Sequence, residues 1–358
     1  MKTEGRTLRK ISARTLYFLW LGLTSLGWVV TGPAAADQNS QIRLGWQIPW
    51  ATQGQLVMGL KYTNITNLVG LSVDYIGFAY GGPLNRAALA GEVDVLLTAD
   101  QPALVLLSRD PSYRIVSRMM YNRVCIYVPA DSKVRELSHL SDKIVMGPTG
   151  AAAERVAMAA LSRAGVDLST IQSGKLDMAQ QSALLANTKD PARWPGVDAL
   201  YGFDPLPAVF KEQGKARILQ CGKVVSVVVA TSEMLQERRD QLKAFLTGFM
   251  LSWNNFTRNP ERMNALFSAE SRLNVSDAVL DDAASIEPNR WVNSIGELRF
   301  GFTRDDFIVF NEANRFLLDR GIIKDSIDAR DYIDMTFINE LVSDTNLTEL
   351  AGKVTITK

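Results

Sequence analysis

Three segments of the sequence, residues 46–54, 98–102 and 148–152, combine polar, aromatic and small residues in a way that suits the binding of a small molecule. Each lies between an apolar, strand-like run and a helical pattern. The unpaired N–H groups at the start of a helix carry about half a positive charge and can hold the polar head of a ligand. Indole rings in the first segment can form a wall for an organic solute. We therefore expect ligand contacts from Trp46, Gln47, Trp50, Thr52, Gln53, Asp100, Gln101, Thr149, Gly150 and Ala151.

The same residues also have structural interpretations, which the sequence leaves open. Thr149 can serve as an ordinary helix N-cap, and a single tryptophan lies more often in a core than in a ligand site. Two tryptophans four positions apart in a polar loop favour the ligand wall. Trp46 is the more structural of the two in this interpretation, because it directly follows the strand.

Catalytic and metal chemistry find little support. The chain contains one histidine, His139, so a multi-histidine metal centre cannot be built, and a Ser-His-Asp or Cys-His catalyst would need that residue. His139 lies in a segment with the pattern of a solvated surface helix. None of the candidate acids, Asp100, Asp177, Asp198 and Asp204, is paired with a second carboxylate in one loop. We expect no catalytic residue, no metal and no cofactor.

The two cysteines, Cys125 and Cys221, both lie in apolar, strand-like runs. They can be two buried thiols that pack as small hydrophobic groups. They can equally form a disulfide, which requires Cα atoms within about 7 Å. The sequence leaves both possibilities open.

Composition indicates a folded protein with a large core. Of 358 residues, 47% are hydrophobic and 22% charged, and 39 basic residues stand against 38 acidic ones. This balance excludes a disordered chain and a strongly basic nucleic-acid binder, so no nucleic-acid partner is expected. The length predicts two domains or one two-lobed unit.

The first 36 residues have the pattern of a cleavable signal peptide. A basic start is followed by an apolar run, residues 16–30, and the segment ends in Pro33 and three alanines. The run is short of the ~20 residues that span a bilayer. We expect cleavage after Ala36 and export to the periplasm.

Alternating strands and helices must position the three segments. The apolar pattern predicts an α/β fold in which parallel strands bind ligands at their carboxyl ends. The expected strands are 42–46, 72–78, 93–97, 123–128, 143–146, 197–201, 216–219 and 224–230, with a short one at Leu176. The expected helices are 53–61, 82–89, 101–108, 134–140, 151–164, 180–187 and one ending near 212, followed by a helical region that includes 242–253, 307–318 and 332–341.

Several motifs resemble the solute-binding proteins of nitrate-, sulfonate- and taurine-type ABC transporters. Residues 196–205, GVDALYGFDP, are similar to that family's G-x-V-D-A-x-x-x-W-D-P segment, with Phe203 in place of the tryptophan. Residues 147–151 resemble its G-x-x-G-S helix opening, with Ala151 in place of the serine. Weaker matches follow in the family's order at 89–95, 98–102, 128–140 and 164–166.

The resemblance implies a two-lobed type II periplasmic binding fold with the ligand cleft between the lobes, and it adds Phe203 and Asp204 to the ligand-binding residues. The implied first lobe comprises residues 37–122 and 225–358, and the second comprises 123–224. The implied function is a monomeric substrate-binding component that delivers a small organic solute, such as a sulfonate, taurine or nitrate-like anion, to an inner-membrane permease and ATPase. The alternatives are a ligand-sensing binding protein and an enzyme of the same fold related to thiamine-pyrimidine synthesis.

Overall fold

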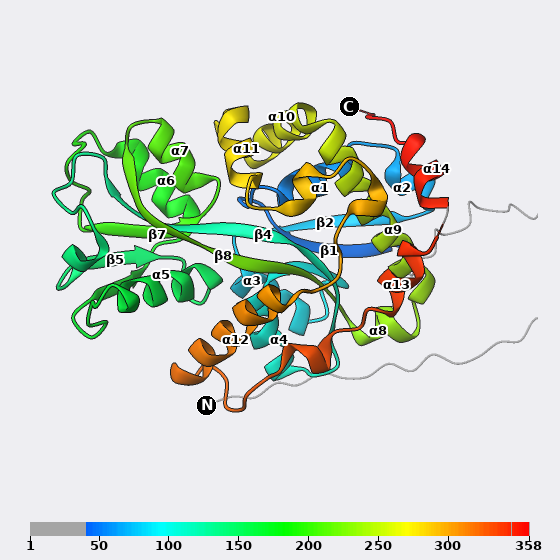
Figure 1. The fold of residues 1–358 in the computed structure, drawn as a ribbon, viewed down its shortest axis with the longest axis horizontal. Coiled ribbons are helices and arrows are strands. Elements are labelled where there is room, and N and C mark those ends of the chain that lie inside the picture. Colours follow the sequence, from blue (N-terminus) through cyan, green and yellow to red (C-terminus); the bar gives the residue numbers. More distant parts are fainter. Residues whose placement is uncertain (1–40, 345, 358) are drawn as a thin grey trace, which may run out of the picture. The chain divides into compact units, whose positions relative to one another are not determined.

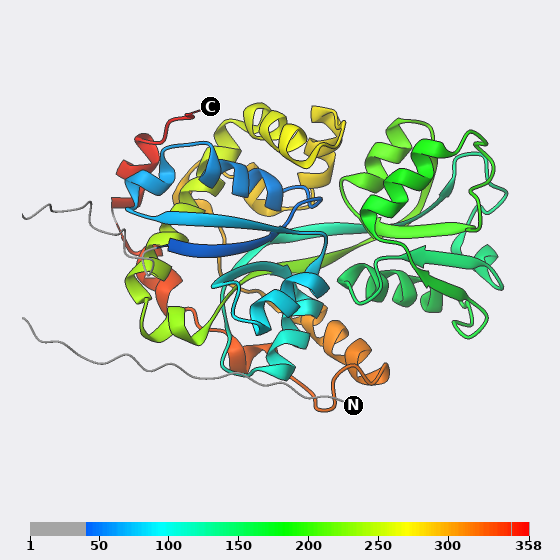
Figure 2. The same cartoon turned by 180° about the vertical axis from the view of Figure 1, so that it is seen from behind.

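The computed structural model describes residues 41–344 and 346–357, so the expected signal peptide lies outside the described residues. Within them, one mixed sheet of eight strands has the order β2-β1-β3-β8-β4-β7-β5-β6 (Figures 1 and 2). The strands are β1 (Gln41–Gln47), β2 (Ser72–Phe78), β3 (Val95–Ala99), β4 (Arg114–Pro129), β5 (Ile144–Gly147), β6 (Gln172–Lys175), β7 (Ala199–Phe203) and β8 (Ala216–Ala230).

Two long antiparallel strands, β4 and β8, join two sets of parallel strands. They pair along their whole length, from Arg114 opposite Ala230 to Pro129 opposite Ala216. At one end of this ladder β8 pairs with β3, which leads to the parallel strands β1 and β2. At the other end β4 pairs with β7, which leads to the parallel strands β5 and β6. The sheet thus supports two lobes, a first lobe around β1–β3 and a second around β5–β7 (Figure 1).

Helices cover the sheet in both lobes. In the second lobe, α5 packs on β4, β7 and β8. In the first lobe, α4 packs on α12, and α1 packs on α9 and α10. The helices are α1 (Gln53–Lys61), α2 (Ile65–Leu68), α3 (Gly81–Leu89), α4 (Asp100–Arg109), α5 (Ala152–Arg163), α6 (Met178–Asn187), α7 (Leu206–Glu212), α8 (Ser232–Gln236), α9 (Arg239–Arg258), α10 (Pro260–Ser271), α11 (Asp277–Ala284), α12 (Arg304–Asp319), α13 (Thr336–Val342) and α14 (Asn346–Gly352). The 3₁₀ turns are η2 (Leu137–Leu140), η3 (Pro288–Trp291), η4 (Ile295–Glu297) and η5 (Ala329–Tyr332).

The α/β fold predicted from the sequence is confirmed, with corrections at the strands that join the lobes. The predicted strand 123–128 is the second half of β4, which begins at Arg114. The runs 216–219 and 224–230 are one strand, β8, rather than two. The helix expected at 134–140 is only the 3₁₀ turn η2. The strand expected at Leu176 is β6, which ends at Lys175.

The long helix α9 shows why the C-terminal region is part of the first lobe. Its apolar positions recur every three or four residues, and Leu242, Phe245, Phe249 and Trp253 are all fully buried. This face packs on α1. None of the described residues forms a helix both long and apolar enough to cross a membrane.

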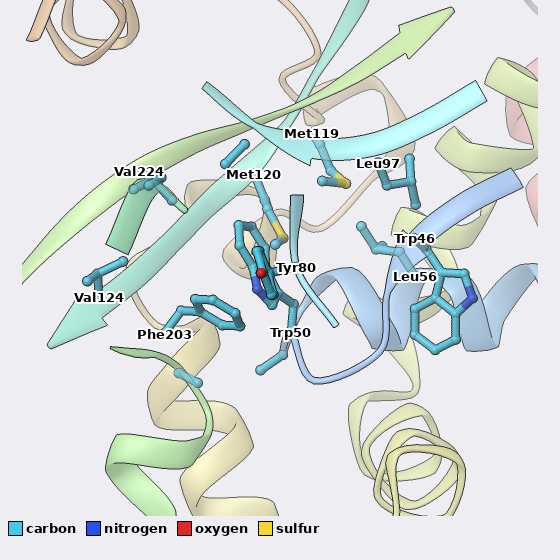
Figure 3. Close-up of a cluster of buried hydrophobic side chains, with 14 of the residues drawn as sticks. Trp46, Trp50, Leu56, Tyr80, Leu97, Met119, Met120, Val124, Phe203 and Val224 are labelled. Carbon is cyan, nitrogen blue, oxygen red and sulfur yellow. The ribbon is translucent and has the colours of Figure 1, made fainter. Parts of the chain in front are cut away.

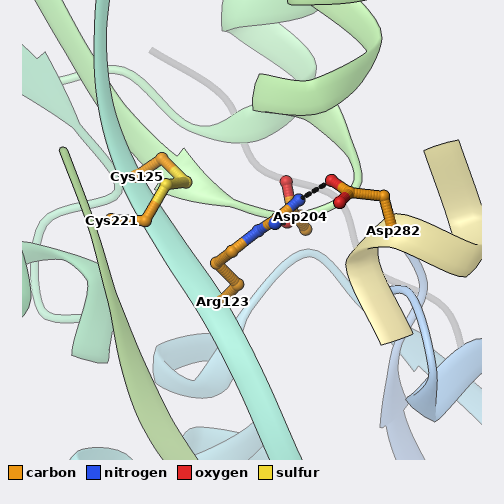
Figure 4. Close-up of a disulfide and its surroundings, with 5 residues drawn as sticks. All are labelled: Arg123, Cys125, Asp204, Cys221 and Asp282. Atoms are coloured by element: carbon orange, nitrogen blue, oxygen red, sulfur yellow. Dashed lines mark hydrogen bonds and ion pairs between the residues drawn. A yellow bond between two sulfur atoms is a disulfide. The ribbon is translucent and has the colours of Figure 1, made fainter. Parts of the chain in front are cut away.

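Cys125 and Cys221 form a disulfide that ties β4 to β8 (Figure 4). The two residues are direct partners in the β4–β8 ladder, with their Cα atoms 4.0 Å apart. The structure therefore decides between the two possibilities that the sequence left open.

Candidate functional site

The carboxyl ends of two pairs of parallel strands, one pair in each lobe, meet where the two lobes touch. Strands β1 and β3 of the first lobe lead into the loop 48–52 and into Asp100, while β5 and β7 of the second lead into 148–151 and Asp204. Contacts cross between these loops: the backbone N–H of Ala51 donates to the Asp204 carbonyl at 3.3 Å. The side-chain amide of Gln101 donates to the Ala151 carbonyl at 3.2 Å. The structure therefore brings the segments singled out from the sequence to one place.

An aromatic pair forms the centre of this contact (Figure 3). The rings of Trp50 and Phe203 lie 4.6 Å apart, centre to centre, and are inclined by 58°. Both side chains are buried, and the indole N–H of Trp50 has no hydrogen-bond partner among the described residues. Trp46 is equally buried but lies apart from this pair, near Leu56 in the core of the first lobe. Of the two tryptophans, Trp50 therefore contacts the opposite lobe.

Gln47 and Gln53 fix the loop after β1. The backbone N–H of Gln47 donates to Gln53 Oε1 at 2.6 Å, and both side-chain amides point to the Leu97 carbonyl, at 3.3 and 3.5 Å. Thr52, at the start of α1, has φ +67°, a conformation that a β-branched residue rarely adopts. Its backbone N–H donates to Gln55 Oε1 at 2.6 Å, which helps to hold that conformation. Gln47 Oε1 is buried without a partner in the described part of the chain.

Asp100 and Arg155 form a buried ion pair between the lobes. Nη2 of Arg155, on α5, lies 2.9 Å from both carboxylate oxygens of Asp100, on α4. The backbone N–H groups of Gln101 and Val225 also donate to this carboxylate. Burial raises the pKa of Asp100, and Arg155 together with the two N–H groups opposes that rise. The sequence did not reveal Arg155, because it stands beside Glu154 and looks like half of a solvated charge pair.

A backbone N–H group at the start of α5 already has a hydrogen-bond partner on the same helix. Thr149 and Gly150 are exposed, whereas Ala151 is buried. The N–H of Gly150 donates to Glu154 Oε2 at 2.8 Å, so a carboxylate of this chain occupies the place expected for an anionic ligand head. Gly150 has φ +80°, a backbone conformation that favours glycine.

Asp204 is a second buried carboxylate at the contact between the lobes. It pairs with Arg123 of β4, which also pairs with Asp282 of α11 (Figure 4). Burial raises the pKa of Asp204 to about 6, while Arg123 and a hydrogen bond from the Ala208 backbone oppose the rise. One oxygen, Oδ1, has no partner in the described residues.

Polar atoms that are buried but unpaired within the described residues gather at this contact. Beyond the residues predicted from the sequence, they include the Oδ1 atom of Asn122, whose amide donates to the Ala51 carbonyl at 3.3 Å. Buried polar groups in native proteins are nearly always hydrogen-bonded, so such atoms mark places where a ligand can bind. The set comprises Gln47 Oε1, Trp50 Nε1, Thr52 Oγ1, Gln101 Oε1, Asn122 Oδ1, Arg155 Nε and Asp204 Oδ1.

Other chemistry is poorly supported within the described residues. No three His, Cys, Asp or Glu side chains are grouped so as to hold a metal ion. His139 pairs with Glu136 and lines a hollow of about 740 Å³ together with Trp194 and Asp198 of the second lobe.

The fold is that of periplasmic binding proteins. No family model and no curated protein matches the sequence. Among solved structures, the alkanesulfonate-binding protein SsuA from Xanthomonas axonopodis pv. citri, bound to MOPS, superposes with a TM-score of 0.67 at 15% identity, covering 84% of this chain and 100% of that one. The periplasmic aliphatic sulphonate binding protein SsuA from Escherichia coli has a TM-score of 0.64 at 17% identity, covering 83% and 92%.

An enzyme shares the same fold. The protein DSZB in complex with biphenyl-2-sulfinic acid, described elsewhere as a desulfurization enzyme, superposes with a TM-score of 0.63 at 14% identity, covering 84% of this chain and 98% of that one. At identities this low, the likeness establishes the architecture, and function must be argued from the site.

Proposed function

We propose that this protein is the substrate-binding component of an ABC importer and that it binds a small organic solute between its two lobes without covalent change. The observation that carries the proposal is the convergence of four strand ends at a contact between lobes joined by β4 and β8. Such an arrangement can open and close around a ligand. The matched sulfonate-binding proteins support the same function.

The solute we propose is an organic anion of the sulfonate type. This follows the sulfonate-binding function of the structural neighbours, and it fits a lobe contact that includes a buried arginine and unpaired amide groups. The partners of a monomer with this function are a permease and an ATPase in the inner membrane. The lobe boundaries, near residues 122 and 224, remain a prediction.

Binding without catalysis is part of the proposal. Both cysteines are held in the disulfide, so neither offers a free thiol as a nucleophile. The chain's one histidine, His139, lies among residues of the second lobe that line a different hollow. The acids at the lobe contact, Asp100 and Asp204, are each held by an arginine.

Export to the periplasm is also proposed. The disulfide is of a kind that persists in oxidising compartments. Cleavage after Ala36 would give a mature protein that begins at Asp37. N-terminal sequencing of the exported protein tests this, and retention of residues 1–30 would contradict it.

A thermal-shift screen of the mature protein tests the proposed function. The panel contains methanesulfonate, hexanesulfonate, taurine, nitrate, hexanoate and hexylammonium, and a bound solute raises the unfolding temperature by mass action. We expect at least one sulfonate to raise it in a saturable way and isothermal titration calorimetry to give a 1:1 complex. If no member of the panel binds, or if a member is chemically converted, the proposed function is wrong.

A further inference from the structure

A groove between α5 of the second lobe and α12 of the first lobe is formed by two adjoining hollows. Figures 1 and 2 show the two helices side by side next to β8. The hollows have volumes of about 230 and 420 Å³ and share Arg155, Ala159, Arg163 and Glu312, so they adjoin each other. The contact around Trp50 and Phe203, by comparison, is filled by the protein's own side chains.

Arg155 lines both hollows with donor capacity that the protein does not use. Only 2% of its side chain is exposed. Nη2 is held by Asp100, Nη1 lies 3.6 Å from Glu312 Oε2, and Nε has no hydrogen-bond partner in the described residues. A guanidinium group is always charged in proteins and carries five N–H donors. Because a buried donor without a partner is costly, a ligand oxygen that reached Nε would be bound favourably.

The other residues of the groove favour a ligand that combines a negative charge with an apolar body. Five basic and three acidic side chains line it, and Arg163 and Lys223 line the smaller hollow together with Arg155. Apolar side chains, Val156 and Phe316 among them, provide contact area for carbon chains. Ile308, on α12, is 48% exposed although it is large and apolar. Such a surface suits an anionic head joined to an apolar tail.

We propose that this groove holds the solute, with the head of an amphipathic organic monoanion, a sulfonate or a carboxylate, bound by Arg155 and its tail against Ile308. Asp100 acts as a positioning residue, because both of its carboxylate oxygens hold Nη2 of the guanidinium group. This inference rests on the proposed function and assigns the solute a place that differs from the aromatic pair.

Isothermal titration calorimetry with hexanesulfonate, hexanoate and hexylammonium tests the inference on the mature protein. We expect the two anions to bind and the cation not to bind. Arg155→Lys keeps a positive charge beside Asp100 but removes Nε, and it should raise the Kd of hexanesulfonate at least tenfold. Glu312→Gln removes the acidic group near Nη1 and should lower that Kd severalfold. Glu340→Gln is its control, since Glu340 is exposed to a similar extent and pairs with Lys243 outside the groove.

Ile308→Glu provides a test that does not disturb the core. It should raise the Kd of hexanesulfonate at least fivefold, while Ile322→Glu, at an exposed isoleucine outside the groove, should leave it within twofold. If Arg155→Lys does not fold, the Kd values of Ile308→Glu and Glu312→Gln decide whether the groove holds the solute. The inference is overturned if neither anion binds the unmodified protein, or if these two variants match their controls. Should another solute bind with a Kd that these variants leave unchanged, the proposed function stands and this inference alone fails.

Discussion

Trp46 and Trp50 lie four residues apart but in different surroundings, and this difference can be measured. Trp46 packs in the core of the first lobe, whereas Trp50 contacts Phe203 of the second. Trp46→Ala should lower the free energy of unfolding by about 3–5 kcal/mol and leave the Kd of the folded fraction unchanged. Trp50→Ala should raise the Kd about 30-fold, which corresponds to about 2 kcal/mol, because it weakens closure of the lobes. Urea unfolding and calorimetry on both variants check this, and a reversed pattern would remove Trp50 from the site.

Asp204 should make stability depend on pH in a defined direction. Burial raises its pKa to about 6, from an ordinary value of 3.8, so the folded protein holds a proton there more tightly than the unfolded chain does. The stabilising contribution of this group is complete below about pH 4 and is lost as the pH rises through about 6, a change of about 3 kcal/mol. Asp204→Asn has no carboxyl group to titrate at this position and so avoids that loss. The free energy of unfolding of the variant, taken relative to that of the unmodified protein, should therefore be larger at pH 7.5 than at pH 4.

Urea unfolding at the two pH values measures the difference. Asp282→Asn is the comparison variant, because Asp282 shares the partner Arg123 and its charge adds to the rise in the pKa of Asp204. It should reduce the loss of stability with rising pH but not abolish it, since burial is the larger cause of that rise. A difference for Asp204→Asn that stays constant with pH would contradict the assignment.

The sequence identified most of the loops at the lobe contact but not the arginine that crosses it. Aromatic and small residues at strand ends are a local signal, and they led to Trp50, Gln101 and Ala151. Arg155 pairs with Asp100 across 55 positions of the chain, and nothing near it in sequence distinguishes a buried arginine from a solvated one. Asn122 was missed because it lies in the part of β4 that was not predicted as a strand.

At the scale of elements, prediction succeeded where one face of a strand or helix is buried and failed where the chain passes between lobes. The bounds predicted for α1 and β2 match the structure. Residues 114–122 of β4 are buried on both faces and contain Arg118, which Glu287 and Asp306 neutralise, so no alternation is visible. In β8, residues 220–223, QCGK, are mostly exposed and interrupt the apolar pattern, which made one strand look like two. The edge strand β6, QSGK, has no apolar signal at all.

The start of α5 gives a prediction about a helix end. Glu154 already accepts the N–H of Gly150, so Gly150→Asp would place a second carboxylate at this helix end and should abolish binding of hexanesulfonate if the helix end contributes to the site. Gly150→Asn is the matched control, since it has nearly the same shape and meets the same strain at φ +80° but carries no charge. Calorimetry on the two variants separates charge from strain. Equal Kd values for both would show that this helix end does not bind the anion.

The disulfide gives a prediction about the two strands that join the lobes. Cys125 and Cys221 are separated by 96 positions, so opening the bridge frees a long loop in the unfolded chain. The double variant Cys125→Ser, Cys221→Ser should lose about 2–5 kcal/mol of unfolding free energy, measured in urea. Addition of a reductant should destabilise the unmodified protein by a similar amount and leave the double variant unaffected. An identical urea midpoint with and without reductant would contradict a bridge in the exported protein.

At the scale of the whole molecule, the lobes are connected through their sheet rather than through a flexible linker. β4 pairs with β7 of the second lobe and β8 pairs with β3 of the first, while the two strands pair with each other along their length. A movement of one lobe against the other must therefore twist this ladder. The ladder has three register shifts. Those between Ile115 and Ser117 and between Arg118 and Met120 lie on the first-lobe side of the disulfide, and the one between Ile126 and Tyr127 lies on the second-lobe side. The regular pairing is therefore interrupted on both sides of the bridge.

This connection predicts that the two lobes unfold together. Proteins of this size often unfold in several steps, but here neither lobe can lose its sheet without breaking the β4–β8 ladder that both of them need. Trp46, Trp50 and Trp253 report on the first lobe and Trp194 on the second. Urea transitions followed by tryptophan fluorescence and by far-ultraviolet circular dichroism should coincide, both in the unmodified protein and in Trp194→Phe, whose fluorescence comes mainly from the first lobe. A bound solute should move the single transition to higher urea as a whole, because it stabilises only the state in which both lobes are folded. Two separate transitions, with only one of them shifted by the solute, would show that the shared strands do not couple the lobes.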